Sequence, residues 1–305
     1  MMLRKPSKMR RFLSSKLFPR SSALGGDLCG YHFAARTEEL SALPQDAYGR
    51  IRDSIRDLAQ EPRPNSSKKL AGRSVPDRDQ YNQDGLVTIH NHDFMESPTF
   101  KAAYQRGVKV AGTDYNWHWR VHIDLWAAAM ASKLPGDFVE CGVNRGFLSS
   151  AIMQFLEWDR LGKQFYLLDT FRGIDVRYVS SEELASGVME KSKTAIDSGF
   201  YVVGSQSVRA NFSEWKNTRI IEGPIPETLP EVAARQIAFC HIDMNCSSPE
   251  VAALSCFWDR LVLGAVVLLD DYAYYGYQLP KTVWTGLRRE RGWQSPLCRP
   301  ARACS

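Results

Sequence analysis

The second half of the chain alternates between short apolar runs and stretches whose apolar residues have helical spacing. The runs are "DFVECG" from Asp137, "QFYLLDTF" from Gln164, "TRIIEG" from Thr218, "IAFCHIDM" from Ile237 and "GAVVLLDDY" from Gly264. Segments such as "GFLSSAIMQFLEW" and "SPEVAALSCFWDRL" separate them and have the pattern of helices. Apolar strands that alternate with helices are typical of a parallel sheet covered on both faces. The pattern predicts an α/β fold with a doubly wound, mostly parallel sheet in residues 105–305.

The first third of the chain has a different pattern. Residues 1–36 are basic and bear several serines, so we expect a disordered tail there. Residues 37–104 combine charged helical patterns with the breaking segment "EPRPNSSKK" and an aromatic stretch. We expect this part to form a helical and loop extension, or a lid, on the sheet domain.

The last residues, "TGLRRERGWQSPLCRPARACS", show no strand alternation and contain two prolines. We therefore expect that C-terminal strands of the sheet are missing and that a sheet edge is left exposed. An antiparallel hairpin in these residues would contradict that expectation.

Composition narrows the class of protein. With 305 residues and 44% hydrophobic content the chain can bury a full core. Seven of its 39 lysines and arginines precede the first acid, Asp27, and the remainder is slightly acidic, which argues against a nucleic-acid surface. The longest apolar run, "LVLGAVVLL", is too short to span a membrane. Seven cysteines without a C-x-x-C pair favour a reduced, cytoplasmic compartment, with Cys141 and Cys240 in the core.

Acidic residues close four of the predicted strands. Glu140 ends the first, Asp169 the second, Asp243 the fourth, and Asp270 with Asp271 the fifth. Strand ends face solvent and are often acidic, which would explain one or two of these residues. Ligands of open α/β sheets bind beyond the carboxyl ends of the strands, so the full set predicts a binding site there.

The turn after the first strand reads Gly142-Val143-Asn144-Arg145-Gly146. It departs from the dinucleotide fingerprint G-x-G-x-x-G, because asparagine stands where the middle glycine belongs. It resembles the acid-x-Gly-x-x-x-Gly loop of class I S-adenosylmethionine-dependent methyltransferases. This resemblance implies that the cofactor contacts Glu140, Gly142, Asn144, Gly146 and Asp169. Gly142 would let the backbone pass beside the methionine moiety, and Asp169 would accept hydrogen bonds from the ribose hydroxyls.

Residues 110–284 resemble the macrocin O-methyltransferase family. The similar segments are "GPIPETLP" and "HIDMNCSSPEVAALSCFWDRLVLGAVVLLDDYAYYGYQLPK". The family consists of metal-dependent sugar O-methyltransferases of natural-product pathways, and the resemblance implies that Asp243, Asp270 and Asp271 bind Mg²⁺. The chain departs from the family at Asn245, which replaces a second acid.

Metal binding also agrees with the chemistry of the three aspartates. Mg²⁺ prefers carboxylate oxygens, and a cation would relieve the repulsion between acids on neighbouring strands. The alternative is that one acid is protonated or pairs with a cation such as Lys281 or Arg209. As catalytic base we expect Asp243 first and His241 second. His241 has a second interpretation, that of a satisfied core histidine.

The segment "DYNWHWRVH" is expected to form an aromatic wall or lid near the cofactor, with Arg120 available to a carboxylate. Together these features predict an S-adenosylmethionine-dependent and Mg²⁺-dependent O-methyltransferase. Its acceptor would be a hydroxylated small molecule such as a sugar or natural product, and the family resemblance implies a homo-oligomer. Two alternatives stay open. One is a non-catalytic protein that binds S-adenosylmethionine or a partner, and the other is a nicotinamide-dependent oxidoreductase, which Asn144 argues against.

Overall fold

A computed structural model gives the fold, and it describes residues 32–35 and 80–270. Its main sheet has six strands in the order β1-β8-β7-β4-β5-β6. The strands are β1 (His32–Ala35), β8 (Leu261–Leu269), β7 (Ile237–Ile242), β4 (Asp137–Cys141), β5 (Phe165–Asp169) and β6 (Thr218–Glu222). The five strands from β8 to β6 are parallel, and β1 pairs with β8 in the antiparallel direction. The predicted doubly wound, mostly parallel sheet is therefore confirmed.

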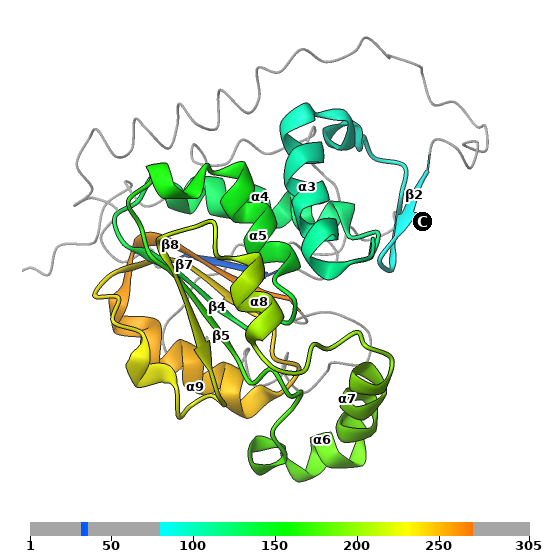
Figure 1. The fold of residues 1–305 in the computed structure, drawn as a ribbon, viewed down its shortest axis with the longest axis vertical. Coiled ribbons are helices and arrows are strands. Elements are labelled where there is room, and N and C mark those ends of the chain that lie inside the picture. Colours follow the sequence, from blue (N-terminus) through cyan, green and yellow to red (C-terminus); the bar gives the residue numbers. More distant parts are fainter. Residues whose placement is uncertain (1–31, 36–79, 271–305) are drawn as a thin grey trace, which may run out of the picture. The chain divides into compact units, whose positions relative to one another are not determined.

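Helices cover both faces of this sheet (Figure 1). One face carries α3 (Pro98–Ala111), α4 (His118–Ser132), α5 (Phe147–Phe155) and α8 (Gln206–Asn211), and the other carries α9 (Ser247–Phe257). Two buried clusters match the two faces: Phe138 and Phe239 belong to the first, and Val139 and Cys240 to the second. Because side chains alternate along a strand, neighbouring residues fill opposite cores. This explains why β7 is buried at every position.

Shorter elements connect these layers. The chain between β5 and β6 contains α6 (Ser181–Ala185) and α7 (Val188–Asp197), which lie apart from the α3–α4–α5 layer (Figure 1). Single 3₁₀ turns occur at Asp93–Glu96, Trp158–Arg160, Val176–Tyr178, Leu229–Glu231 and Trp258–Arg260. Cys141 and Cys240 are buried free thiols, as predicted. No helix among the described residues is long and apolar enough to cross a membrane.

A small hairpin precedes α3, within the range assigned to the extension. Its strands are β2 (Tyr81–Gln83) and β3 (Leu86–Thr88), joined by Asp84 and Gly85. Both turn residues have positive φ, 51° and 73°. Asp-Gly is favoured in such two-residue turns because aspartate tolerates the left-handed conformation and glycine adopts it freely.

Strand β1 lies beside β8 at the edge of the sheet. It lies inside the range 1–36, which the sequence pattern assigned to a tail, and its residues His32–Ala35 pair with Val266–Leu269 of β8. The expectation of an exposed edge beside β8 is therefore wrong for Val266–Leu269, because an N-terminal segment pairs with these residues. The expected loss of C-terminal strands concerns residues 271–305, which lie outside the described residues.

The order of the strands locates a binding site. The chain starts the parallel sheet at β4, adds β5 and β6 on one side, and then continues with β7 and β8 on the other. The order thus reverses between β4 and β7. At such a switch point the loops after the two strands separate and leave a crevice at the carboxyl ends, which is where ligands of this fold class bind.

Candidate functional site

A cavity of about 520 Å³ lies at the carboxyl ends of the parallel strands. The loops after β4, β5, β6 and β7 line it, and the hairpin tip, the segment before α4 and parts of α7 complete its wall. All four described acids of the predicted set are among its lining residues: Glu140, Asp169, Asp243 and Asp270. The cavity therefore coincides with the site predicted from the strand ends, while Asp271 lies outside the described residues.

Gly142 begins the turn after β4, and the structure shows why a side chain would not fit at this position. Its φ is 93°, and a Cβ added there would lie 1.8 Å from the carbonyl oxygen of Asp243. The missing side chain therefore lets the backbones after β4 and β7 approach each other at the switch point. That Gly142 lets the backbone pass beside a cofactor stays a prediction. The structure shows its close approach to the backbone of Asp243.

Asp169 holds the glycine turn in place. Its Oδ2 accepts hydrogen bonds from the backbone amides of Val143 and Asn144, both at 2.7 Å, and its Oδ1 accepts one from Phe171 at 2.7 Å. The hydroxyl of Thr170 lies 3.5 Å from Oδ1 but directs its proton to the carbonyl of Gly173, at 2.6 Å. An ionised carboxylate has about four acceptor positions, so Oδ1 retains one of them for a ligand hydroxyl. Asp169 is thus both a support of the turn and a candidate for binding a ribose.

Asn144 joins the turn to a distant segment. Its Nδ2 donates to the carbonyl of Phe200 at 3.0 Å, and its Oδ1 accepts from the amide of Val202 at 2.9 Å. These two bonds match the pattern of a backbone pair, and they bring Phe200 to Val202 into the cavity wall. The sequence marked Asn144 only as a departure from a glycine pattern and gave no signal for its partners.

Gly146 differs from the other predicted cofactor residues because it does not line the cavity. It precedes α5 with a φ of 83°, and a Cβ there would lie 2.3 Å from the ring of Phe212. Its role in the structure is to allow close packing between α5 and α8. Any effect of Gly146 on a cofactor would be exerted through the turn.

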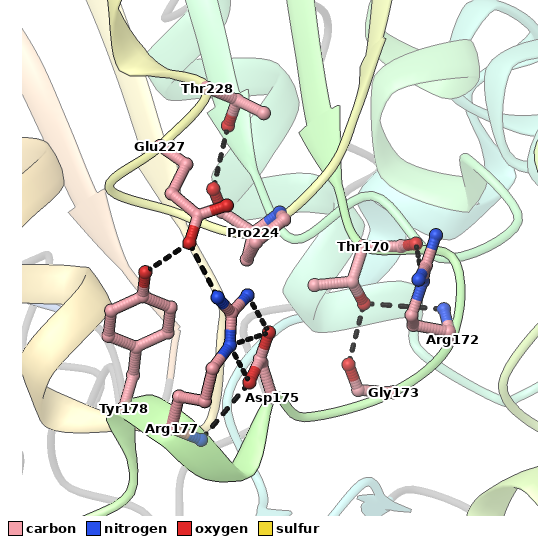
Figure 2. A network of polar contacts seen from close by, with 9 residues as sticks. All are labelled: Thr170, Arg172, Gly173, Asp175, Arg177, Tyr178, Pro224, Glu227 and Thr228. Atoms are coloured by element: carbon pink, nitrogen blue, oxygen red, sulfur yellow. Dashed lines mark hydrogen bonds and ion pairs between the residues drawn. The ribbon is translucent and has the colours of Figure 1, made fainter.

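Two loops at the rim of the cavity are tied together by charged side chains (Figure 2). Arg177 pairs with Asp175 in its own loop and reaches across to Glu227 at 2.8 Å. The hydroxyl of Tyr178 donates to the same Glu227 oxygen at 2.7 Å. Glu227 follows β6 and Arg177 follows β5, so the network joins the connections of neighbouring strands beside the lining residue Pro224.

The end of the cavity near β8 is acidic. Arg120 of α4 donates to Asp84 at the hairpin tip at 2.9 Å and 3.2 Å, and it also pairs with Oδ2 of Asp270. The guanidinium lies over the ring of Trp117, 4.8 Å from its centroid. Arg120, which the sequence predicted to be available to a carboxylate, pairs with two carboxylates of the protein itself.

Aromatic side chains form much of the remaining wall. Tyr115, Trp117, Phe147 and Phe200 all line the cavity, and the rings of Tyr115 and Trp117 lie 4.5 Å apart. The first two come from the predicted aromatic segment. The sequence did not identify Phe147 and Phe200, because a phenylalanine at a helix start or in a loop carries no distinct signal.

His241 is buried behind this wall and does not line it. Its Nδ1 lies 3.0 Å from Oε1 of Glu140, its neighbour in the sheet register. Burial alone would lower the pKa of His241, but the bond to Glu140 and the nearby carboxylates raise it above its ordinary value. The arrangement favours the interpretation as a bonded core histidine, and His241 reaches the cavity only through Glu140.

Asp124 of α4 belongs to the same buried group. Desolvation raises the pKa of Asp124. The negative charges of Asp270 and Glu140 also raise it, whereas the positive charges of His241 and Arg120 lower it. Both of its carboxylate oxygens are buried without a hydrogen-bond partner, as are Oε2 of Glu140 and Nε2 of His241. The acidic end of the cavity is thus backed by an ionisable core that the sequence did not predict.

The residues proposed for Mg²⁺ fit a hard cation in part. Asp243 and Asp270 line one cavity, and Oδ1 of Asp270 is buried without a hydrogen-bond partner. The amide of Asn245 donates to Oδ1 of Asp243 at 3.2 Å, which leaves the Asn245 oxygen as a further neutral ligand. Within residues 32–35 and 80–270, however, no group of three His, Cys, Asp or Glu side chains is arranged to hold a metal.

Comparison with known proteins agrees with this geometry. Residues 122–304 match the model of the macrocin O-methyltransferase family, TylF. A curated relative from Streptomyces olivaceus, 8-demethyl-8-(2,3-dimethoxy-alpha-L-rhamnosyl)-tetracenomycin-C 4'-O-methyltransferase, is 28% identical over 149 residues. That alignment covers 47% of this chain and 56% of the relative, so the chain spans little more than half the length of the protein it matches.

Solved structures to which the chain is similar include the O-methyltransferase NovP, with a TM-score of 0.49 and 19% identity over 64% of this chain and 89% of that one. Another is the calicheamicin methyltransferase CalS11, with a TM-score of 0.40 and 17% identity over 77% of this chain and 97% of that one. The family match, which extends over more than half of the 305 residues, is the decisive finding. The chain belongs to the macrocin O-methyltransferase family.

Proposed function

We propose that this chain is an S-adenosylmethionine-dependent O-methyltransferase that acts on a hydroxyl of a small molecule such as a sugar or natural product. The observation that carries the proposal is the place of Asp169. Its carboxylate closes β5, lines the cavity beside the glycine turn, and keeps an acceptor position on Oδ1 for a ribose hydroxyl. Membership of the family supports the same activity.

The cofactor would lie against the loops after β4 and β5. Asp169 would accept a ribose hydroxyl, and Glu140 would face the positively charged end of the methionine moiety. Gly142 and Asn144 would form the wall between them, while Gly146 supports the turn from behind. Phe200 to Val202, held by Asn144, close this side of the cavity.

In the proposed reaction the S–CH₃ bond breaks, its electron pair stays on sulfur, and a new O–CH₃ bond forms with the acceptor oxygen. The hydroxyl proton has to leave, and Asp243 at the switch point is our candidate base. His241 does not touch the cavity, so we assign it to the support of Glu140. When bound, S-adenosylmethionine supplies the methyl group and Mg²⁺ supplies a Lewis acid that makes the hydroxyl more acidic.

For Mg²⁺ we propose Asp243, Asp270 and Asp271 as ligands. The support is the position of the first two on one cavity and the unpartnered Oδ1 of Asp270. Calorimetric titration of MgCl₂ into the protein, with and without S-adenosylhomocysteine, tests this point. Equal heats with MgCl₂ and with a matched NaCl solution would remove the metal from the proposal.

The acceptor follows from the family only as a class. The curated relative is named for methylation of a rhamnosyl tetracenomycin, so rhamnosyl tetracenomycins are the first acceptors to test. We further propose a cytoplasmic protein, since the four described cysteines are free thiols. The homo-oligomer stays a proposal that light scattering of the purified chain would decide.

The decisive experiment is calorimetric titration of S-adenosylhomocysteine into the wild type, Asp169→Ala and the control Asp159→Ala. Asp159 is an acid outside the cavity wall. We expect affinity in the micromolar range that is lost in Asp169→Ala and kept in the control. No binding by a wild type with a cooperative unfolding transition would refute the proposal. Binding without methyl transfer to any acceptor would favour the non-catalytic alternative.

A further inference from the structure

The hairpin β2–β3 docks on the first turn of α4 through three successive residues of that helix. His118 Nδ1 lies 2.7 Å from Oε1 of Gln83, and the backbone amide of Trp119 donates to the hydroxyl of Tyr81 at 3.0 Å. Arg120 adds its two bonds to Asp84. The side chains of Tyr81, Gln83 and Asp84 thus each have a partner on α4, which holds the hairpin against the start of that helix.

Arg120 connects this hairpin to the sheet. Its Nε and Nη2 donate to Asp84, and its Nη1 donates to Asp270 at the end of β8. The side chains of Arg120 and Asp84 are only 11% and 16% exposed, and that of Asp270 is 2% exposed. Charge-assisted bonds with a planar guanidinium are directional, and partial burial strengthens them. A single arginine therefore sets the position of both carboxylates.

Both carboxylates belong to the acidic end of the cavity. Asp84, Arg120 and Asp270 line it together with Asp243, and β7 and β4 separate β8, which Asp270 follows, from β5, which Asp169 closes. Asp84 and Arg120 also precede residue 122, where the family match begins. The hairpin thus adds a wall to the cavity from outside the part of the chain that matches the family.

We propose that the β2–β3 hairpin is an acceptor-specificity element and that Arg120 is the positioning residue that seats it against Asp270. The proposal rests on the proposed methyl transfer and assigns the acceptor to the acidic end of the same cavity. With Asp84 and Asp270 held by one guanidinium, the hairpin fixes the wall against which a hydroxylated acceptor would lie.

The test uses two variants of the clamp that Arg120 forms with Asp84 and Asp270. Arg120→Lys keeps the charge but cannot bridge two carboxylates with a planar fork. Asp84→Asn removes the charge and keeps a residue that suits the left-handed turn position, so the hairpin turn itself is undisturbed. Both variants should keep the fold, which a urea unfolding curve would verify.

Arg106 provides a matched control. It pairs with Glu214 at 2.7 Å and lies over the ring of Trp215, 4.8 Å from its centroid, the same distance as Arg120 from Trp117. Neither Arg106 nor Glu214 lines the cavity. Arg106→Lys and Glu214→Gln therefore repeat the two chemical changes at an arginine that serves no ligand.

Three quantities are measured for all variants. Hydrogen exchange of residues 81–88 reports the seating of the hairpin, calorimetry gives the affinity for S-adenosylhomocysteine, and kinetics gives KM and kcat for the rhamnosyl tetracenomycin of the curated relative. We expect exchange and KM to rise about ten-fold or more in Arg120→Lys and Asp84→Asn, with kcat and cofactor affinity within about three-fold of wild type. The control variants should change none of these quantities.

Unchanged hairpin exchange in both clamp variants would overturn the proposal, since Arg120 would then not seat the hairpin. A parallel loss of S-adenosylhomocysteine affinity would also overturn it, because the hairpin would then serve the cofactor. A drop in kcat at constant KM would assign the clamp to chemistry instead. If the wild type binds S-adenosylhomocysteine but leaves the test acceptor unmethylated, that acceptor is contradicted, while exchange and cofactor affinity still decide the role of the clamp.

Discussion

Glu183 accepts hydrogen bonds from both the backbone amide and the hydroxyl of Ser247, at 2.8 Å and 2.5 Å. Its other oxygen closes a capping box with Ser180 at the start of α6. Ser247 is the first residue of α9, so one buried carboxylate stabilises the N-termini of two helices. It also anchors the segment between β5 and β6, which forms one side of the cavity, to the loop after β7.

Glu183→Gln should therefore destabilise the protein at neutral pH. The substitution removes the charge that strengthens these bonds, and we expect a loss of about 2 kcal/mol in the free energy of unfolding. Hydrogen bonds from Ser247 and Ser180 outweigh desolvation and lower the pKa of Glu183 below 4.5. A group with a lowered folded-state pKa contributes stability above its unfolded pKa and loses it as the pH falls. The difference should thus shrink from pH 7 to about pH 3 in urea titrations, and the exposed Glu182→Gln should show none.

Gly142→Ala should be far more damaging than a glycine substitution elsewhere. The new Cβ would lie 1.8 Å from the Asp243 carbonyl, whereas a Cβ at Gly162, which also has positive φ, would meet nothing within 4 Å. We expect Gly162→Ala to cost about 1 kcal/mol from backbone strain and Gly142→Ala at least about 3 kcal/mol. Urea unfolding curves measure both, and equal losses would contradict the close approach of the two loops.

The substitution Asn144→Gly removes the side-chain hydrogen bonds of Asn144 while the backbone conformation is kept. Asn144 has a φ of 49°, which glycine adopts without strain, so the turn itself should persist. The bonds to Phe200 and Val202 disappear, and we expect the dissociation constant of S-adenosylhomocysteine to rise about ten-fold. Calorimetry measures this change. An unaltered constant would show that Phe200 to Val202 contribute nothing to cofactor binding.

Asp124→Asn should stabilise the protein at high pH. Desolvation raises the pKa of Asp124 to about 8, against 3.8 for the ordinary group. The folded state therefore holds an extra proton between these values, and wild-type stability falls as the pH rises through this window. The amide does not titrate, so its free energy of unfolding lacks this decrease. Relative to wild type, the variant's free energy of unfolding should rise by on the order of 1–3 kcal/mol as the pH increases from 4 to about 8. Asp197→Asn, at an exposed acid, is the control.

Much of the fold could be predicted because it depends on local pattern. Strands such as β7 are apolar at consecutive positions, and the acids that follow the strands mark the carboxyl edge of the sheet in the sequence itself. The order of layers follows from general rules of handedness. The position of Glu140, Asp169, Asp243 and Asp270 on one cavity was accessible for the same reason.

The remaining features depend on contacts between distant segments. Nothing in the sequence near Asn144 points to Phe200, and nothing near Arg120 points to Asp84, 36 residues earlier. Backbone pairing of β1 with β8 likewise joins residues whose patterns are unremarkable in isolation. Such contacts are selected by the whole fold, which is why the sheet edge was predicted incorrectly and the close approach at Gly142 was missed.

The start of α4 has a practical consequence for expressing this protein. The amides of Trp117 and Trp119 are capped by the hydroxyls of Tyr104 and Tyr81, which lie in segments before the helix. The family match begins at residue 122, inside the first turns of that helix. An expressed fragment cut at this boundary would lose both capping oxygens, the packing of α3 on α5 and the antiparallel partner of β8. The recognisable part of the sequence is therefore smaller than the unit that folds.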